Sequence, residues 1–523
     1  MLLKLVLIVP ILWIVADAAR ILGVFPYPSY SHQIIFRSLT TELARRGHEL
    51  MIFTTDPIND STLQNYTEID LHYYYDSYAV NFYSKHTFGI WTVLSEVYKT
   101  NNKLTDWTLS HPVMQRLLSP NSTEKFDLII MQSLYLDALY GISFRLDAPL
   151  IAITPNPPLA IHHYKLGNPM SAAYAPDLFL GVDGNMNMWQ RFLNMYYYLR
   201  QFIEYEIMVI PSQEKISRKY FGDSMPPVHQ FSSKISLLLV SANPFFLYPR
   251  ANVPGIVYIG GCHLSAQKTQ LPQDLENILN DAKEGFIYFS LGSNVKSNQL
   301  PAETRNMLLR TFAELPYKVL WKFESDYLPD KPDNVIIRKW LPQEAILAHP
   351  NIRLFIYQGG LQSTGEAIEH AVPVISFPVY CDQMLNIKRL QSYGTGKMLQ
   401  LTEVSGKTLK ETIFEIITNS SYKENMRKLR YLLQDLPYNP MDNAIWWVEH
   451  VIRHKGAPHL RNKSRDMPWY QVELLDIMAI IIVIAILAIR IIIAVKRYVF
   501  FKMSKQLMLK IKTKLINNVK KQQ

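Results

Sequence analysis

Mostly apolar runs of five to seven residues alternate with longer amphipathic stretches in the first half of this chain. The runs cover residues 19–25, 48–54, 126–131, 148–154 and 236–240. Nearly continuous apolar runs of this length are typical of parallel strands buried on both faces, and the amphipathic stretches between them are typical of crossover helices. The pattern therefore predicts an α/β fold with a doubly wound, Rossmann-like sheet.

The second half repeats this pattern after a linking stretch at 248–273. Its apolar runs cover residues 286–291, 318–323, 335–338, 352–357 and 372–379. A chain of 523 residues is long enough for two or three ordinary domains. We therefore predict two Rossmann-like domains, over residues 19–250 and 251–465.

His32 lies where the first predicted strand passes into the first predicted helix. The loop 26–31 follows the strand, and a helical pattern from Gln33 to Arg46 ends at Gly47, a residue type that favours a helix end. In the first helical turn, behind a serine N-cap, the helix dipole disfavours protonation, so the imidazole would be neutral and basic near pH 7. The position alone favours an ordinary polar loop histidine, with a general base as the alternative.

Residues 340–383 combine a buried strand with a glycine turn and a helix start. The run Ile352–Tyr357 leads into Gln358-Gly359-Gly360, and a helical pattern opens with Ser363. Free N–H groups at a helix N-terminus, and glycines that let a ligand approach the backbone, make such a turn a ready anion site. The pair Asp382-Gln383 follows the next apolar run, where a polar ligand would meet a strand end.

Each polar residue of this stretch also has a structural alternative. Ser363 and Glu366 have the spacing of a capping box, in which Glu366 would only bind backbone N–H groups. Trp340 alone is more often a core residue than a platform for a flat ligand. Asp382 alone is usually a turn residue, and Cys381 beside it is more often a small apolar filler.

The two ends of the chain carry targeting patterns. Residues 1–18 contain one lysine, an apolar stretch and a final Ala-Asp-Ala, which predicts a secretory signal peptide cleaved after Ala18, with a retained anchor as the alternative. Residues 474–495 include a 19-residue apolar window interrupted by Arg490 alone. Such a window is long enough to cross a bilayer, and a buried soluble helix is the alternative.

The net charge of +10 is concentrated in the tail, residues 496–523. Nine lysines and arginines and no acidic residue lie there, so the basicity belongs to one segment and does not indicate a nucleic-acid-binding groove on a folded domain. Lysines that follow an apolar span place the tail in the cytosol. The pair Lys520-Lys521 resembles the dilysine signal that returns type I membrane proteins to the endoplasmic reticulum.

Modification and metal patterns narrow the picture further. N-glycosylation sequons occur at Asn59, Asn65, Asn121, Asn419 and Asn462, which together with the signal peptide predicts a lumenal body. The two cysteines, Cys262 and Cys381, form no disulfide framework, although a single bridge stays open. No Cys/His cluster has zinc-site spacing and no Asp-x-Asp occurs, so we expect neither a cofactor nor a metal.

The spacing of seven polar positions in 340–383 resembles the nucleotide-sugar signature of the UDP-glycosyltransferase family, nearest to its insect branch. The positions are Trp340, Gln343, Gln358, Ser363, Glu366, Asp382 and Gln383. The resemblance covers nearly the whole mature chain and implies a GT-B fold, in which two Rossmann-like domains face each other. It also implies that the first domain binds the acceptor and the second binds the UDP-sugar.

The resemblance implies a role for each position. Trp340 would stack on uracil, with Gln343 at the edge of the base. Gly359, Gly360 and Ser363 would hold the diphosphate, and Ser293 could add a contact. Glu366 would take the ribose hydroxyls, and Asp382 and Gln383 the sugar hydroxyls.

The chain departs from the family pattern at Gln358, where most members have His. Glutamine can donate a hydrogen bond to phosphate but cannot carry charge. The family base would be His32, paired with an aspartate. Vertebrate-type members carry that aspartate where this chain has Gln132, whereas insect-type members often have one a few residues on, which matches Asp137. We therefore predict Asp137 as the residue that orients His32.

These observations predict a glycosyltransferase of the endoplasmic reticulum membrane. It would be single-pass, with lumenal catalytic domains and a cytosolic tail, and would transfer a hexosyl group to a hydroxyl of a small lipophilic acceptor by an inverting, metal-independent mechanism. Glucose is the sugar that the insect resemblance favours, and glucuronate is the alternative. A non-catalytic UDP-sugar or lipophile binder is the rival function, and homo- or hetero-oligomerisation stays open.

Overall fold

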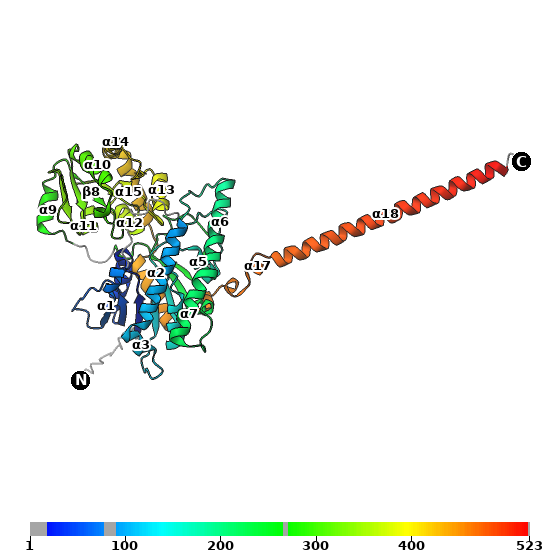
Figure 1. Ribbon diagram of the computed structural model, residues 1–523, viewed down its shortest axis with the longest axis horizontal. Helices are drawn as coiled ribbons and strands as arrows, with labels where there is room; N and C mark the ends of the chain where they lie inside the picture. Colours follow the sequence, from blue (N-terminus) through cyan, green and yellow to red (C-terminus); the bar gives the residue numbers. More distant parts are fainter. Residues whose placement is uncertain (1–17, 78–89, 265–269, 521–523) are drawn as a thin grey trace, which may run out of the picture. The chain divides into compact units, whose positions relative to one another are not determined.

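The computed structural model describes residues 18–77, 90–264 and 270–520. It divides into a compact unit that ends at Arg461 and a second unit that begins at Asn462. The predicted signal peptide, apart from Ala18, lies outside the described residues. The compact unit contains two separate sheets, each covered by helices (Figure 1).

The first sheet has seven strands in the order β3-β2-β1-β4-β5-β6-β7, and every pairing is parallel. Its strands are β1 (Arg20–Phe25), β2 (Glu49–Thr54), β3 (Tyr66–Asp70), β4 (Leu128–Gln132), β5 (Leu150–Thr154), β6 (Ile235–Val240) and β7 (Ile256–Tyr258). The helices between them are α1 (Tyr30–Arg45), α2 (Ile90–Ser110), α3 (Pro112–Leu118), α4 (Gly141–Leu146), α5 (Ala160–Leu166), α6 (Met188–Glu204), α7 (Ile210–Phe221) and α8 (Val228–Phe231).

Alternate residues of β1 show why this sheet is buried on both faces. Ile21 packs in a core with α1, whereas Leu22 and Val24 pack in a separate core on the other face. Because successive side chains of a strand point to opposite faces, a strand covered on both sides must be apolar throughout. The prediction of a doubly wound α/β fold is confirmed.

The second sheet has six parallel strands in the order β10-β9-β8-β11-β12-β13. They are β8 (Phe286–Ser290), β9 (Lys318–Lys322), β10 (Val335–Arg338), β11 (Ile352–Tyr357), β12 (Val374–Ser376) and β13 (Gly396–Met398). Its helices are α9 (Gln273–Asn280), α10 (Ala302–Ala313), α11 (Gln343–Leu347), α12 (Leu361–Glu369), α13 (Gln383–Ser392), α14 (Gly406–Thr418) and α15 (Ser420–Gln434).

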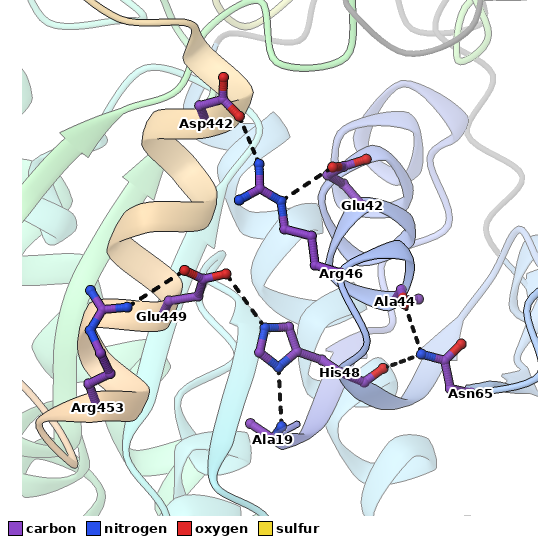
Figure 2. A network of polar contacts seen from close by, with 9 residues as sticks. All are labelled: Ala19, Glu42, Ala44, Arg46, His48, Asn65, Asp442, Glu449 and Arg453. Atoms are coloured by element: carbon purple, nitrogen blue, oxygen red, sulfur yellow. Dashed lines mark hydrogen bonds and ion pairs between the residues drawn. The ribbon is translucent and has the colours of Figure 1, made fainter. Parts of the chain in front are cut away.

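Helix α16 (Pro440–Arg453) follows the second sheet in sequence but packs on the first. Arg46 after α1 forms an ion pair with Asp442, and His48 before β2 lies 3.7 Å from Glu449 (Figure 2). The buried face of α16, including Ala444 and Val448, joins the core that contains β1. Helix α16, near the end of the compact unit, therefore packs against the elements at its beginning.

The same network contains Asn65, one of the predicted glycosylation sites. Its side-chain amide donates to the carbonyl oxygens of Ala44 at 2.8 Å and His48 at 2.6 Å (Figure 2). A glycan on this nitrogen would displace at least one of these hydrogen bonds. Asn59, Asn121 and Asn419 are exposed and are better placed for modification.

The second unit contains α17 (Trp469–Val472) and the 46-residue helix α18 (Leu475–Lys520). Helix α18 is long and apolar enough to cross a membrane. None of its most apolar window is buried in the structure. An exposed apolar helix of this length is typical of a single membrane span and not of a buried core helix. The helix continues through the basic residues of the tail.

Candidate active site

A cavity of about 690 Å³ lies where the loops of the two sheets meet. In the first sheet the strand order reverses at β1 and β4, and in the second it reverses at β8 and β11. Loops that follow such neighbouring strands turn to opposite faces of the sheet and leave a crevice beyond the strand ends. The cavity is lined from both crevices, by Ser31 and His32 on one side and by Ser293 and Gln358 on the other.

His32 lies in the first turn of α1, as expected, although the helix begins earlier than predicted, with Ser29 as its N-cap. The imidazole is 9% exposed, and its ring stacks on Tyr27 with 5.3 Å between centroids. Burial lowers the pKa of His32 to about 3, because an imidazolium loses hydration there. The ring is therefore neutral at physiological pH and lines the cavity.

The structure does not bring Asp137 to His32. Asp137 is buried in a short turn after β4, where its carboxylate pairs with Lys165 and accepts a hydrogen bond from the hydroxyl of Tyr205 at 2.8 Å. Among the described residues it is not part of the cavity wall. The side chain that reaches His32 is Gln132, whose Nε2 lies 3.1 Å from Nδ1. This corrects the expected pairing, because a buried cation holds the aspartate elsewhere.

Two glycine turns lie side by side at the cavity wall that the second sheet provides. Gly292 has φ +85°, and a Cβ built on it would lie 2.3 Å from the Gln358 amide nitrogen, so this side chain rests on the glycine. Gly359 has φ +94°, which L-residues rarely adopt. The buried amide oxygen of Gln358 has no hydrogen-bond partner among the described residues. Gly360 precedes α12, so the free N–H groups of that helix start beside the cavity.

Gln343, Ser363 and Glu366 are joined in one hydrogen-bonded group. The Gln343 amide donates to Ser363 Oγ at 2.8 Å and to Glu366 Oε2 at 2.6 Å. The N-cap of α12 is Gly360, without a side-chain cap, so the capping-box alternative for Ser363 and Glu366 is wrong. Burial raises the pKa of Glu366 to about 7, which leaves a carboxyl that can accept hydrogen bonds from a ligand.

Trp340 is 52% exposed and lines the cavity, so it is not the core residue of the alternative reading. The rings of Trp340 and Tyr30, a residue of the first domain, pack in an edge-to-face arrangement with 4.6 Å between their centroids. Lys322 at the end of β9 lies 5.5 Å from the Trp340 ring. A flat base could lie on such a ring, which is where the resemblance places uracil.

Asp382 and Gln383 begin α13 at the cavity wall. The Asp382 carboxylate accepts a hydrogen bond from Asn386 at 2.9 Å, and burial raises the pKa of Asp382 to about 6. The Gln383 oxygen accepts from the backbone N–H groups of Val379 and Tyr380. The oxygen is therefore committed to the backbone, and the amide NH₂ is what Gln383 can offer to a sugar hydroxyl.

Neither Cys262 nor Cys381 takes part in a disulfide, so the bridge that the sequence left open is not formed. Cys262 is buried in the core that contains β1 and α16. Cys381 lines the cavity and has φ +56°.

The sequence did not predict two hydrogen bonds between the domains, or the helix that forms part of the cavity wall. The hydroxyl of Ser29 and the amide of Asn294 are hydrogen-bonded between the two domains at 3.1 Å, and Gln362 donates to the carbonyl of Pro155 at 2.7 Å. Helix α2 of the first domain contributes Thr92, Val93, Val97 and Thr100 to the cavity wall. No sequence signal identified the two hydrogen bonds between the domains, because the residues that each bond joins are more than 200 positions apart.

Most of the chain is similar to known proteins. The family model described as "UDP-glucoronosyl and UDP-glucosyl transferase" matches residues 21–513. The chain is 36% identical to the UDP-glycosyltransferase UGT5 of Dactylopius coccus, with 91% of each chain covered. It is 33% identical to UDP-glucosyltransferase 2 of the same insect, with 90% of each covered.

A solved structure supports the same fold. The glycosyltransferase of kitacinnamycin superposes with a TM-score of 0.56 at 16% identity, covering 83% of this chain and 99% of that one. This likeness agrees with the GT-B fold expected from the sequence. The two facing sheets, the shared cavity and the family match lead to one conclusion: the chain belongs to the UDP-glucuronosyl and UDP-glucosyl transferase family and is a glycosyltransferase.

Proposed function

We propose that the enzyme transfers glucose from UDP-glucose to a hydroxyl of a small lipophilic acceptor, with inversion at the anomeric carbon and without a metal. One observation supports this most strongly. His32 and the hydrogen-bonded group Gln343, Ser363 and Glu366 line one cavity, although they belong to different sheets. A base and a nucleotide site on opposite walls are what a direct transfer between two substrates needs.

In the proposed reaction, the acceptor oxygen forms a bond to the anomeric carbon while the bond from that carbon to the diphosphate oxygen breaks. The acceptor proton passes to His32, and UDP leaves with the electron pair of the broken bond. The first N–H groups of α12, with Ser363 and the Gln358 amide, stabilise the charge that develops on the diphosphate. Attack from the face opposite UDP gives the β-glucoside.

The two domains contact each other around the cavity, which supports a reaction that excludes water. Beyond the contacts of Ser29 and Gln362, Arg389 donates to the carbonyl of Phe246 at 2.8 Å. Closure of domains over bound substrates limits hydrolysis of an activated donor. Glucose is proposed as the sugar because one relative is named a UDP-glucosyltransferase.

We further propose that α18 anchors the enzyme in the endoplasmic reticulum membrane with the catalytic unit in the lumen and the basic tail in the cytosol. The apolar window of α18 and the lysines after it support this topology. Protease added to sealed microsomes should remove only the tail. Glycosidase treatment of the protected product should then lower its apparent mass. A protected tail would contradict the orientation.

The reaction is tested by incubating membranes that contain the full chain with UDP-glucose or UDP-glucuronate and a panel of phenols. Mass spectrometry should detect a product heavier than the acceptor by one glucosyl group. A glucuronosyl product alone would correct the donor. Binding of UDP without any product from either donor would overturn the proposed transfer to this acceptor class.

A further inference from the structure

Gln132 is the last residue of β4 and is fully buried beside the imidazole of His32. Its amide makes two contacts in opposite directions. The oxygen accepts from the backbone N–H of Tyr27 at 3.4 Å, and the nitrogen lies 3.1 Å from His32 Nδ1. The backbone bond thus turns the NH₂ group toward the imidazole.

This orientation fixes the tautomer of His32. An NH₂ group that donates to Nδ1 leaves the single proton of a neutral imidazole on Nε2. A base that takes a proton through Nε2 needs the opposite tautomer, with Nδ1–H as donor. Gln132 can accept from that N–H only if its amide rotates and gives up the Tyr27 bond.

A carboxylate in the same place would not face this choice. Both of its oxygens accept, so it could bind the Tyr27 N–H and the Nδ1–H of His32 at once. It would also stabilise the imidazolium that forms when the proton is taken, because opposite charges at this distance favour the charged form. Gln132 offers only a neutral dipole, and Asp137 is held by Lys165 and Tyr205.

Other charged groups of the cavity lie on the walls around His32. Those from the first domain are Arg37, Glu96 and Lys103, and those from the second are Lys322, Glu344, Glu366 and Asp382. Tyr27 stacks on the ring, and Tyr30 lies on the same helix as His32. Burial lowers the pKa of His32, in keeping with an imidazole that no carboxylate supports.

A weakly supported base transfers protons well only from hydroxyls that are themselves acidic. A phenol such as tyrosine has a pKa of about 10, whereas an aliphatic alcohol is closer to water at about 15.7. We propose that Gln132 is the positioning residue of His32 and that it restricts the enzyme to acidic hydroxyls, so that phenols are good acceptors and aliphatic alcohols are poor ones. The proposal rests on the proposed transfer with His32 as base.

The wild-type enzyme gives the first test. Ring-substituted phenols and benzyl alcohol, of similar size, are compared with one UDP-sugar by kcat/KM. The expected result is a value for phenols at least about 10²-fold above that for benzyl alcohol, the scale on which base catalysis acts. Equal values would overturn the restriction and leave the transfer intact. No product from any acceptor, with UDP still bound, would overturn the transfer itself.

The variant Gln132→Glu supplies the carboxylate at the same side-chain length. Its kcat for benzyl alcohol should rise about tenfold or more, since each pKa unit gained by the base can be worth up to a factor of ten. The rate for 4-nitrophenol should change by less than about threefold. The pH–rate profile should shift to a higher pKa for the base, which a merely structural role of Gln132 would not cause.

The matched control is Gln132→Met, which keeps length but removes both hydrogen bonds and should lower kcat for both acceptors alike. Thermal melting and UDP affinity show whether each variant is folded. A folded Gln132→Glu enzyme with an unchanged ratio of phenol to benzyl alcohol would overturn the role of Gln132. If that variant does not fold, the wild-type acceptor series decides.

Discussion

The carboxyl edge of the first sheet presents His32 and Gln132 among aromatic and aliphatic side chains, whereas that of the second presents glycine turns and hydrogen-bonded polar side chains. Both edges lie where the strand order reverses. In the proposed function, the same topology serves proton transfer at one edge and binding of an anionic nucleotide at the other.

The difference lies in what each edge adds to its crevice. At the donor edge, Gly292 has positive φ and brings the backbone close to the cavity, and Gln343 is hydrogen-bonded to Ser363 and Glu366. At the acceptor edge, the imidazole of His32 is hydrogen-bonded to the amide of Gln132. Changes at the donor edge should therefore act on binding, and changes at the acceptor edge on the rate of transfer.

The largest effect is expected from His32→Ala. Removing the base should lower kcat by about 10²–10⁴, while UDP binds as before because the donor edge is untouched. Product formation by mass spectrometry and UDP binding by calorimetry measure the two quantities. Full activity of the variant would show that His32 is not the base.

Glu366→Ala should have the next largest effect and the opposite signature. Loss of a hydrogen-bond acceptor that can be charged costs about 1.5–3 kcal/mol, which corresponds to a UDP affinity lower by about 10–10². At saturating donor, kcat should fall much less. An unchanged affinity for UDP would remove Glu366 from the nucleotide site.

Gln358→His should alter the donor side by a smaller factor. Histidine can carry a charge that glutamine cannot, so the KM for the UDP-sugar or the rate of departure of UDP should change by up to about tenfold. The preference among acceptors should stay the same, since Gln358 rests on Gly292 at the donor edge. An altered acceptor range would break the division between the two edges.

A weaker, pH-dependent effect is expected for uridine, which has no phosphate to titrate. Because the pKa of Glu366 is raised to about 7, its carboxyl is mostly neutral at pH 5.5 and mostly charged at pH 8. Hydrogen bonds to the charged form are stronger, so uridine affinity should rise severalfold across this interval. The Glu366→Gln variant should lose this dependence, and a wild-type affinity that does not vary with pH would contradict the ribose role.

The same shift has a consequence for stability with the opposite sign. A carboxyl whose folded pKa lies above its unfolded value of 4.5 favours folding when protonated, so its contribution is lost as the pH rises from 4.5 through about 7. The ligand-free Glu366→Gln variant should therefore melt above the wild type at pH 8 and close to it at pH 4.5.

Asp137→Asn should have the smallest kinetic effect. Breaking the buried pair with Lys165 costs about 3–5 kcal/mol of folding free energy, so the melting temperature should fall. The kinetic constants should stay within about threefold, since Asp137 lies outside the cavity wall. A loss of kcat comparable to that of His32→Ala would restore Asp137 as the partner of the base.

Much of the fold followed from local pattern. The strands β1, β2, β4 to β6 and β8 to β12 were predicted within a few residues, because each lies in a mostly apolar run. The missed strands are β3, a polar edge strand, and β7 and β13, which are three residues long each. Such strands are held by their neighbours and carry too few apolar residues to be recognised alone.

The sequence by itself determined the strand-to-helix position of His32, the glycine turn at Gln358 and the spacing of the donor residues, because each depends on neighbours in the chain. Only the tertiary structure decided that Gln132 meets His32 and that Asp137 meets Lys165. It also showed that Glu366 bonds Gln343 and does not cap its helix. The physical reason is that these partners lie on separate elements, and packing of the sheets sets the distances between them.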